Sequence, residues 1–441
     1  MSKIRLFGTS SGYVEIAPAA AASNNTLTAP STVGEIIAKD AAGAIGITSM
    51  KASNVNVGAA VTITESGIEA SGIGITCANI NGGQISGRRN IVINGAMMVA
   101  QRGTSTTTSG YLIDRQNVFF SGLDESLTMA QADVSSGTSP YAEGFRKSLK
   151  LTNGNQTSGA GSGDRIQPQN KIEAQDIANS GWKYTDPNSF ITLSFWAKSS
   201  VAQTFYGYLR SKDGTEQRYA YSVALSANTW TKVIKTIPGN SNLQFDSDRN
   251  EGLQWNILLP FIGTDLTDSG VSLNSWGAYA GGTRPPDNTS TWYTTNDATF
   301  ELTGLQLEVG TQASAFEHRT FNDELSLCQR YFQKYTCSSQ EWIYLEGAGA
   351  SYKWWQSHFH PMRTTPTVDV SGLSTGSGTN AAGLTGEISS LSVTSTSAQT
   401  SSGANGRVSY RVTFSAESGT ARTLHHTDSW SGDSVTYSAE L

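Results

Sequence analysis

The sequence is poor in charged residues. Asp, Glu, Lys and Arg make up only 15% of its 441 residues, whereas about 25% is usual in soluble proteins. The 30 basic and 36 acidic residues give a net charge of −6, and no uninterrupted basic run is longer than Arg88-Arg89. Nucleic acids and anionic membranes attract proteins through dense basic surfaces. The composition therefore argues against both as partners.

Cysteines and long apolar stretches are also scarce. Cys77, Cys328 and Cys337 are three in number and far apart, unlike the dense, even set of a disulfide-stapled secreted domain. No run of about 18 apolar residues is present, and residues 1–7 lack the apolar stretch of a signal peptide. We therefore expect free thiols, synthesis in a cytoplasm and no membrane insertion.

Glycine and short β-branched or aromatic runs are plentiful, which predicts a mainly β fold. In residues 1–89, Ile4, Leu6, Val14 and Ile16 flank a glycine-containing turn and predict a hairpin. Further on, isoleucines recur at short intervals among glycines, at 63, 68, 73, 80 and 85. So few apolar groups do not offset a backbone ordering cost of roughly 1–2 kcal/mol per residue. We expect identical chains to wrap into a shared β shaft, the alternative being a flexible linker.

The sequence pattern of residues 90–320 predicts one domain. Short apolar and aromatic runs alternate with turn signals, and the runs lie at 91–93, 111–120, 189–197, 204–209, 219–225, 229–237, 254–262 and 298–309. Strands at such intervals are typical of a β-sandwich, here of jelly-roll type. In the run at 189–197, Ile191, Leu193 and Phe195 are expected to share one face.

Residues 321–336 predict a short connector helix, with Asn322 as its N-cap and Arg330 and Lys334 in its last turn. Residues 337–441 then predict a second, smaller sandwich that forms a tip, with strands at 341–345, 352–360, 365–370, 390–396, 408–414 and 435–441. Between them, residues 371–406 contain Glu387 as their only acid, and we expect long uncharged loops suited to binding.

Signatures of familiar metal, phosphate and redox sites are missing: the sequence has no H-E-x-x-H, Walker or C-x-x-C motif. Candidate acids in turn-like segments are Asp246, Asp248, Glu251, Asp265 and Asp268. They suit solvated turns, a structural cation, or the carboxylate pair of a glycosidase, which sequence spacing does not reveal. The start at Asp246 resembles a calcium loop but has Glu251 in place of its glycine.

His358 and His360 have the spacing of two side chains on one strand face. Three chains could bring these imidazoles to a metal on a common axis, although an ordinary packed pair explains the spacing as well. We expect no catalytic residue, no bound metal and no cofactor.

Aromatic side chains are the remaining candidates for binding, because sugar rings stack on them through their C–H faces. In the middle domain the candidates are Trp276 and Trp292, in a Gly/Pro-rich segment with Tyr279, Tyr293 and Arg284. In the tip they are Trp342, Tyr344, Trp354, Trp355 and Trp430. Most of these rings are expected in cores, and which domain carries recognition stays open.

Several ordered motifs resemble those of bacteriophage tail fibres, particularly of phages that infect cyanobacteria and other aquatic bacteria. They are RNIVING at 89–95, QRG at 101–103, DR at 114–115, FWAK at 195–198, GLQLEVG at 304–310, AFEHR at 315–319, DELSLCQRYF at 323–332, PMRTTPT at 361–367 and AEL at 439–441. The segment before PMRTTPT departs from the family, because His358 and His360 stand where it usually has apolar residues.

The resemblance implies an elongated homotrimeric fibre of a virion, made in the host cytoplasm. Its N-terminal part would join a tail or baseplate protein, its jelly roll would be like a carbohydrate-binding module, and its tip would bind a host surface polysaccharide or lipopolysaccharide without cleaving it. Two alternatives are a tailspike-like enzyme that degrades the glycan and a structural fibre or adaptor with no receptor contact of its own.

Overall fold

The computed structural model describes residues 89–336, 362–372 and 434–441, and elsewhere the backbone of strands at 4–7, 13–16, 55–57, 61–64, 67–70, 351–358, 377–379, 385–387, 392–400 and 408–415. Strands account for 40% of the structure and helices for 8%, which confirms the mainly β prediction. The chain divides into two compact units, residues 1–77 and 78–441. No helix within the described residues is long and apolar enough to cross a membrane.

The first unit contains two small antiparallel sheets. Strands β1 (Ile4–Phe7) and β2 (Tyr13–Ile16) pair with Ile4 opposite Ile16, as the hairpin pattern predicts. Strands β3 (Val55–Val57), β4 (Val61–Thr64) and β5 (Gly67–Ala70) form the second sheet. Ile63 there lies opposite Ile68, while the isoleucines at 73, 80 and 85 fall outside the described residues. The trimeric shaft stays a prediction.

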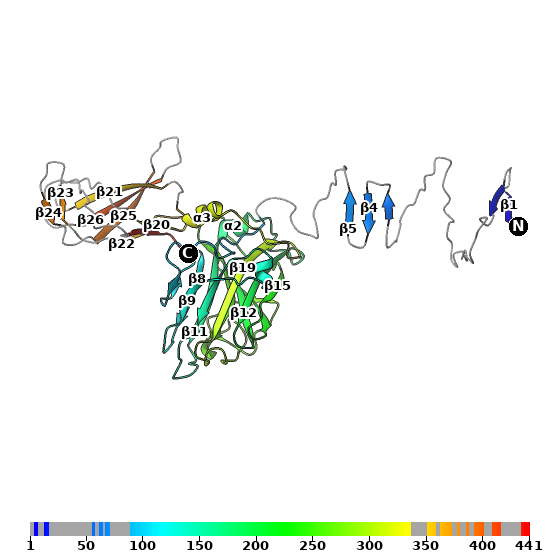
Figure 1. The fold of residues 1–441 in the computed structure, drawn as a ribbon, viewed down its shortest axis with the longest axis horizontal. Helices are drawn as coiled ribbons and strands as arrows, with labels where there is room; N and C mark the ends of the chain where they lie inside the picture. Colours follow the sequence, from blue (N-terminus) through cyan, green and yellow to red (C-terminus); the bar gives the residue numbers. More distant parts are fainter. Residues whose placement is uncertain are drawn as a thin grey trace. The chain divides into compact units, whose positions relative to one another are not determined.

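The second unit is built on a sandwich of two antiparallel sheets (Figure 1). The smaller sheet has the order β15 (Thr231–Pro238), β12 (Phe190–Ser199), β19 (Thr299–Val309), β10 (Lys147–Thr152), β9 (Thr128–Asp133) and β6 (Ser105–Thr106). The larger has the order β18 (Trp276–Ala278), β14 (Gln217–Leu225), β13 (Gln203–Ser211), β16 (Glu251–Leu259), β11 (Arg165–Glu173), β8 (Gln116–Ser121) and β7 (Gly110–Tyr111), with β17 (Phe261–Ile262) beside β11.

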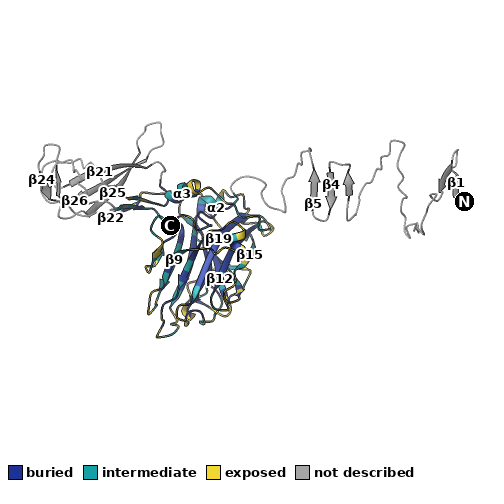
Figure 2. Cartoon of the chain, viewed as in Figure 1, coloured by how far each residue is buried: buried dark blue, intermediate teal, exposed yellow. Residues whose placement is uncertain are grey.

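The core lies between these sheets, where Figure 2 shows the strands as largely buried. Ile191, Leu193 and Phe195 of β12 all belong to it, as their alternation predicts. Phe195 meets Trp255 of the opposite sheet at 5.7 Å between ring centroids. Burying each side chain of this size contributes roughly 1.5–3 kcal/mol, so this layer fixes the larger sheet in place.

Some of the expected strands are interrupted or absent. Residues 91–93, predicted as a strand, enter a turn in which Asn94 adopts φ 57°. The predicted strand at 111–120 is split into β7 and β8 by a turn with Arg115 at φ 67°. These predictions were wrong because side-chain hydrogen bonds to the backbone, such as Asn94 Nδ2 to Val99 O at 2.8 Å, hold the local turns.

Strand β11 was missed because its sequence is polar and contains Pro168. It nevertheless lies between β8 and β16 in the larger sheet. Pro168 pairs with Val118 of β8, but neither it nor Gln167 has a partner on the β16 and β17 side, where Pro260 separates those two strands. A residue without an N–H is tolerated at such a break in the ladder.

The helices are short: α1 (Ser139–Ala142), α2 (Ala174–Ala178), the 3-10 turn Thr264–Leu266 and α3 (Phe321–Gln329). The connector helix predicted at 321–336 is too long. Thr320, not Asn322, caps α3, accepting the N–H of Asp323 at 3.2 Å. Arg330 follows the helix, and Lys334 lies in strand β20 (Phe332–Thr336), because this segment pairs with a C-terminal strand.

The C-terminal part contributes two three-stranded sheets and a hairpin. One sheet has the order β20, β27 (Ser434–Ser438), β22 (Thr367–Gly372), and the other β21 (Ser351–His358), β26 (Val408–Ser415), β25 (Ser392–Thr400). The region expected as loops at 371–406 also carries β23 (Ser377–Thr379) and β24 (Thr385–Glu387), which pair as antiparallel strands. The strand expected at 341–345 lies outside the described residues, and the second sandwich stays a prediction.

Candidate functional site

A groove of about 310 Å³ lies on the larger sheet of the sandwich. Amide, aromatic and basic side chains line it, and they come from four strands and the segment after β18. The lining residues are Asn117, Phe119, Arg165, Gln167, Gln169, Lys171, Tyr208, Arg210, Gln254, Tyr279 and Arg284. None of these described lining residues is Asp or Glu.

The two-residue period of β-strands builds the groove. Along β11, residues 165, 167, 169 and 171 line it, whereas Ile166 and Ile172 belong to the core between the sheets. The register then brings partners alongside, with Phe119 opposite Gln167 and Gln254 opposite Lys171. Side chains far apart in the sequence therefore meet on one face.

Hydrogen bonds orient the amides of the groove. Arg284 Nη1 donates to Gln167 Oε1 at 3.4 Å, and Gln167 Nε2 donates to the Tyr208 hydroxyl at 3.2 Å. Gln254 Nε2 donates to Gln169 Oε1 at 3.2 Å. Because all three glutamine side chains are held in this way, their remaining donors and acceptors are preorganised for a polar ligand.

Two half-buried aromatic rings, Phe119 and Tyr279, add apolar surface. The guanidinium of Arg210 lies 3.7 Å from the centroid of Tyr279. Glu216 holds that guanidinium through bonds of 2.9 Å to Nε and 2.5 Å to Nη2. The guanidinium of Arg165 lies 4.5 Å from the Phe119 centroid. Stacked cations thus fix the positions of both rings.

Positive charge gathers in the groove although the chain is acidic overall. Arg210 is paired with Glu216, and Lys171 lies 4.0 Å from Glu251 and donates to Leu441 O at 2.7 Å. Arg165 and Arg284 form no ion pair with a described carboxylate. Burial lowers the pKa of Arg165, and the nearby charge of Arg284 lowers it further. The sequence lacks a long basic run, and the strand register assembles this cluster instead.

Asn256 is an unusual residue next to the groove. It pairs with Gln169 on one side and with Tyr208 on the other, and its side chain is completely buried. Within the described part of the chain, neither its Oδ1 nor its Nδ2 has a hydrogen-bond partner. An unpaired buried amide costs about 1–3 kcal/mol, so Asn256 does not contribute favourably to folding.

The two tryptophans predicted as sugar contacts in this domain have other roles. Trp292 is completely buried and donates from Nε1 to Thr299 O at 3.0 Å, so its prediction was wrong: its indole fills the core. Trp276 is half-buried, packs on Tyr219 at 5.4 Å and donates to Pro238 O at 2.7 Å. It supports the sheet beside the groove and is not among the residues that line it.

The structure does not describe the side chains of the aromatic residues predicted to bind sugar in the tip. Trp342, Tyr344 and Trp430 lie outside the described residues, as does His360. Trp354 and Trp355 belong to β21, where their backbones pair with Val412 and Arg411 of β26. Their contact with a receptor stays a prediction.

The candidate acids are spread over several turns. Asp248 accepts from its neighbour Asn250, Asp265 accepts from Ser162 Oγ at 2.9 Å, and Asp268 accepts from the N–H of Gly270 at 2.7 Å. None of the five, Asp246 and Glu251 included, lines the groove. Across the residues that the structure describes, no three His, Cys, Asp or Glu side chains gather as a metal site would require.

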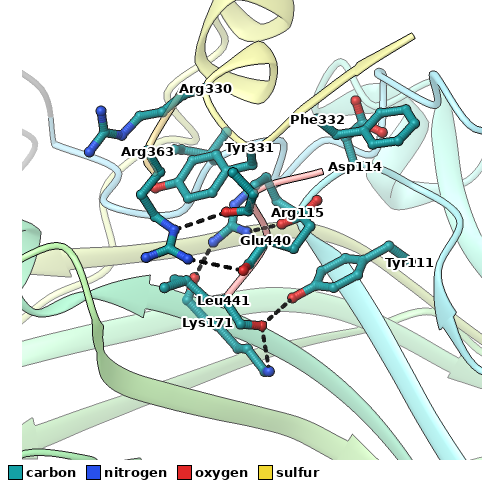
Figure 3. Close-up of polar contacts among 12 residues, drawn as sticks. Tyr111, Asp114, Arg115, Lys171, Arg330, Tyr331, Phe332, Arg363, Glu440 and Leu441 are labelled. Atoms are coloured by element: carbon teal, nitrogen blue, oxygen red, sulfur yellow. Dashed lines mark hydrogen bonds and ion pairs between the residues drawn. The ribbon is translucent and has the colours of Figure 1, made fainter. Parts of the chain in front are cut away.

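A second polar cluster unites five of the short sequence motifs that the family resemblance uses (Figure 3). Glu440 forms ion pairs with Arg102, at 2.9 Å, and with Arg115. Arg363 donates to Ala439 O at 2.9 Å and to Glu440 O at 3.1 Å. We call Arg102, Arg115, Arg363 and Glu440 the C-terminal latch.

Neighbouring groups enclose the latch. The guanidinium of Arg102 lies 3.6 Å from the centroid of Phe332, and that of Arg115 lies 3.6 Å from that of Tyr331. The Tyr331 hydroxyl in turn donates to the buried Glu173 at 2.6 Å. The QRG, DR, QRYF, PMR and AEL motifs therefore encode the attachment of the C-terminal segment to the sandwich.

No family model and no curated protein matches the chain. Among solved structures, it is similar to the enzymatically active domain of tailspike protein 4 from bacteriophage CBA120, with 11% identity and a TM-score of 0.25 over 50% of this chain and 21% of that one. It therefore spans about a fifth of the tailspike chain.

Two carbohydrate-binding modules are similar at the same level. One is a family 16 module, with 11% identity and a TM-score of 0.21 over 43% of this chain and 89% of that one. The other is the CBM22-1 xylan-binding domain of Paenibacillus barcinonensis Xyn10C, with 10% identity and a TM-score of 0.23 over 48% and 94%. Scores this low establish no shared function, and the β-sandwich assignment rests on the sheet order itself.

Proposed function

We propose that the chain is a receptor-binding fibre of a phage tail and that the groove on its sandwich binds a host surface glycan without cleaving it. One observation carries the glycan part of this proposal: oriented amides and half-buried aromatic rings share one groove. Amides suit the hydroxyls of a sugar, and rings suit its C–H faces.

The proposal of a fibre rests on the ordered motifs that resemble those of tail fibres and on residues 1–77, which have too few apolar side chains to form a core of their own. A homotrimer would supply partners for the isoleucines of residues 1–77, and the N-terminal part would join the tail or baseplate. Three copies on one axis would also strengthen a weak sugar contact through effective concentration. Light scattering should then give about three times the chain mass of 46.9 kDa, and a monodisperse monomer would contradict the fibre model.

Binding without catalysis is proposed because the described lining of the groove contains no carboxylate, whereas most glycosidases need two across the scissile bond. The competing reading, a glycan-degrading tailspike, predicts release of reducing sugar from the polysaccharide that the protein binds. Chain-length analysis of that polysaccharide after incubation separates the two, and shortened chains would replace our proposal.

A glycan array tests the groove directly. We expect the full chain to bind a defined subset of glycans and Tyr279→Ala to weaken that binding by roughly fivefold or more, about 1 kcal/mol. Tyr141→Ala is the matched control, since Tyr141 also stacks under an arginine, at 3.9 Å from Arg146, but does not line the groove. Equal loss in both variants, or none in Tyr279→Ala, would refute the assignment of binding to the groove.

A further inference from the structure

Two arginines in the groove lack the acidic partners that cations in such a place usually have. Arg210 has Glu216, but within the described residues no carboxylate lies within 4.0 Å of Arg165 or Arg284. Both arginine residues are half-buried. Partial burial of a cation without a counter-ion disfavours the free protein, which an anionic ligand would reverse.

Their existing hydrogen bonds leave donors available. Within the described residues, Arg165 donates from Nε to Ser121 Oγ at 3.2 Å, and its terminal amino groups are not used by these contacts. Arg284 donates from Nε to Gly281 O at 3.1 Å and from Nη1 to Gln167 at 3.4 Å, which leaves Nη2. A planar carboxylate accepts such paired N–H groups well.

The other residues that line the groove indicate which class of molecule carries the carboxylate. Gln167, Gln169 and Gln254 offer neutral amides for hydroxyl groups, and Phe119 offers an apolar ring. A ligand that matches cations, amides and a ring in one groove is an anionic sugar, whereas a free inorganic anion would leave the amides and the ring unused. The net charge of −6 means that this local positive site is not a general property of the surface.

We infer that the groove selects an acidic saccharide, whose carboxylate is held by Arg165 and Arg284 while its hydroxyls bond to the glutamine amides. This inference rests on the proposed glycan binding and narrows its ligand class. It also differs from a neutral glycan bound by uncharged loops, which the composition of the tip suggests.

The test uses the full chain and an array of matched pairs, in which each uronate-containing polysaccharide is printed beside its carboxyl-reduced form. Arg165→Gln and Arg284→Gln are each expected to weaken binding to the acidic members by tenfold or more. Arg165→Lys keeps the positive charge but loses the two parallel N–H donors of the guanidinium, and its binding is expected to lie between that of the wild type and that of Arg165→Gln. Arg146→Gln is the control, because Arg146 is exposed and outside the groove.

Loss of binding in Tyr279→Ala shows that a glycan binds in the groove, and the arginine variants then show whether its carboxylate is recognised. Tyr279-dependent binding that is confined to acidic members, weakens with salt and needs Arg165 supports the inference. Tyr279-dependent binding to carboxyl-reduced members, unchanged in Arg165→Gln, overturns the acidic class but leaves the proposed function. Binding to no glycan, or better binding to single-stranded DNA printed as a comparison, overturns both.

Discussion

Replacing Glu440 by Gln should strongly destabilise the second unit. Arg115 and Glu440 are almost inaccessible, with side-chain exposures of 2% and 8%. The substitution keeps the shape of Glu440 but leaves the Arg115 guanidinium buried without a negative partner. Breaking a buried ion pair from one side costs about 3–5 kcal/mol. The remaining contacts of Arg115 do not replace the negative charge of Glu440. Arg115 Nη2 donates to the neutral carbonyl Lys171 O, and Nε has no hydrogen-bond partner in the described structure.

Urea unfolding followed by tryptophan fluorescence would measure this change, because Trp255 and Trp292 report on the core. Asp133→Asn is the control: its ion pair with Lys147 is 2.6 Å long, but Asp133 is 82% exposed, so we expect little change. The double variant Arg115→Met with Glu440→Leu should recover most of the loss, because both charges are then removed together. A Glu440→Gln variant as stable as the wild type would refute the view that the latch holds the C-terminal segment.

Two further predictions concern buried polar groups. Asn256→Leu should raise the free energy of unfolding by about 1–3 kcal/mol, since it removes an unpaired amide. Asn153→Leu should lower that free energy, because Asn153 Nδ2 donates to Tyr293 O at 2.6 Å. Chemical denaturation of both variants checks this, and a lower free energy of unfolding in Asn256→Leu would contradict it. Burial raises the pKa of Asp114 to about 6, outweighing its contact with Arg102, while the unfolded value is about 3.9. The folded state therefore binds the proton more tightly, so lowering the pH from 7 to 4 should stabilise the wild type relative to Asp114→Asn by roughly 2–3 kcal/mol. Thermal melts across that range measure the difference, and relative destabilisation in acid would mean that the ion pair dominates.

Periodic apolar patterns predicted much of the sandwich. Strands such as β12 and β14 could be found because buried alternation leaves a visible two-residue period in β-branched and aromatic residues. Strand β11 could not, because its outward side chains are polar and its inward positions include Pro168 and Asn170. The hydrophobic signal is therefore weakest along the strand whose outward side chains line the groove.

Most of the groove was missed for a related reason, although Tyr279 and Arg284 of its lining belong to the candidate aromatic segment. Aromatic content alone pointed to Trp276 and Trp292, but one supports the sheet and the other is core. One weak signal was available: Arg165, Gln167, Gln169 and Lys171 occupy alternate positions, and Ile166, Pro168 and Ile172 are apolar, although Asn170 interrupts the pattern. The contributions of Arg210 and Arg284 depend on strand register and loop path, which a single sequence does not reveal.

The motifs of the family resemblance show a similar limit. Arg115 and Glu440 are 325 residues apart, and only the folded chain shows that they form one buried pair. The sequence motifs that contain them therefore meet in the attachment of the C-terminal segment to the sandwich.

The most direct measurement is a crystal structure of the full chain soaked with the oligosaccharide that binds best on the array. Our account predicts sugar density in the groove, with a ring against Phe119 or Tyr279 and hydroxyls within hydrogen-bonding distance of Gln167 and Gln169. Density confined to residues outside the groove, with the groove side chains unchanged, would contradict the assignment of recognition to this sheet.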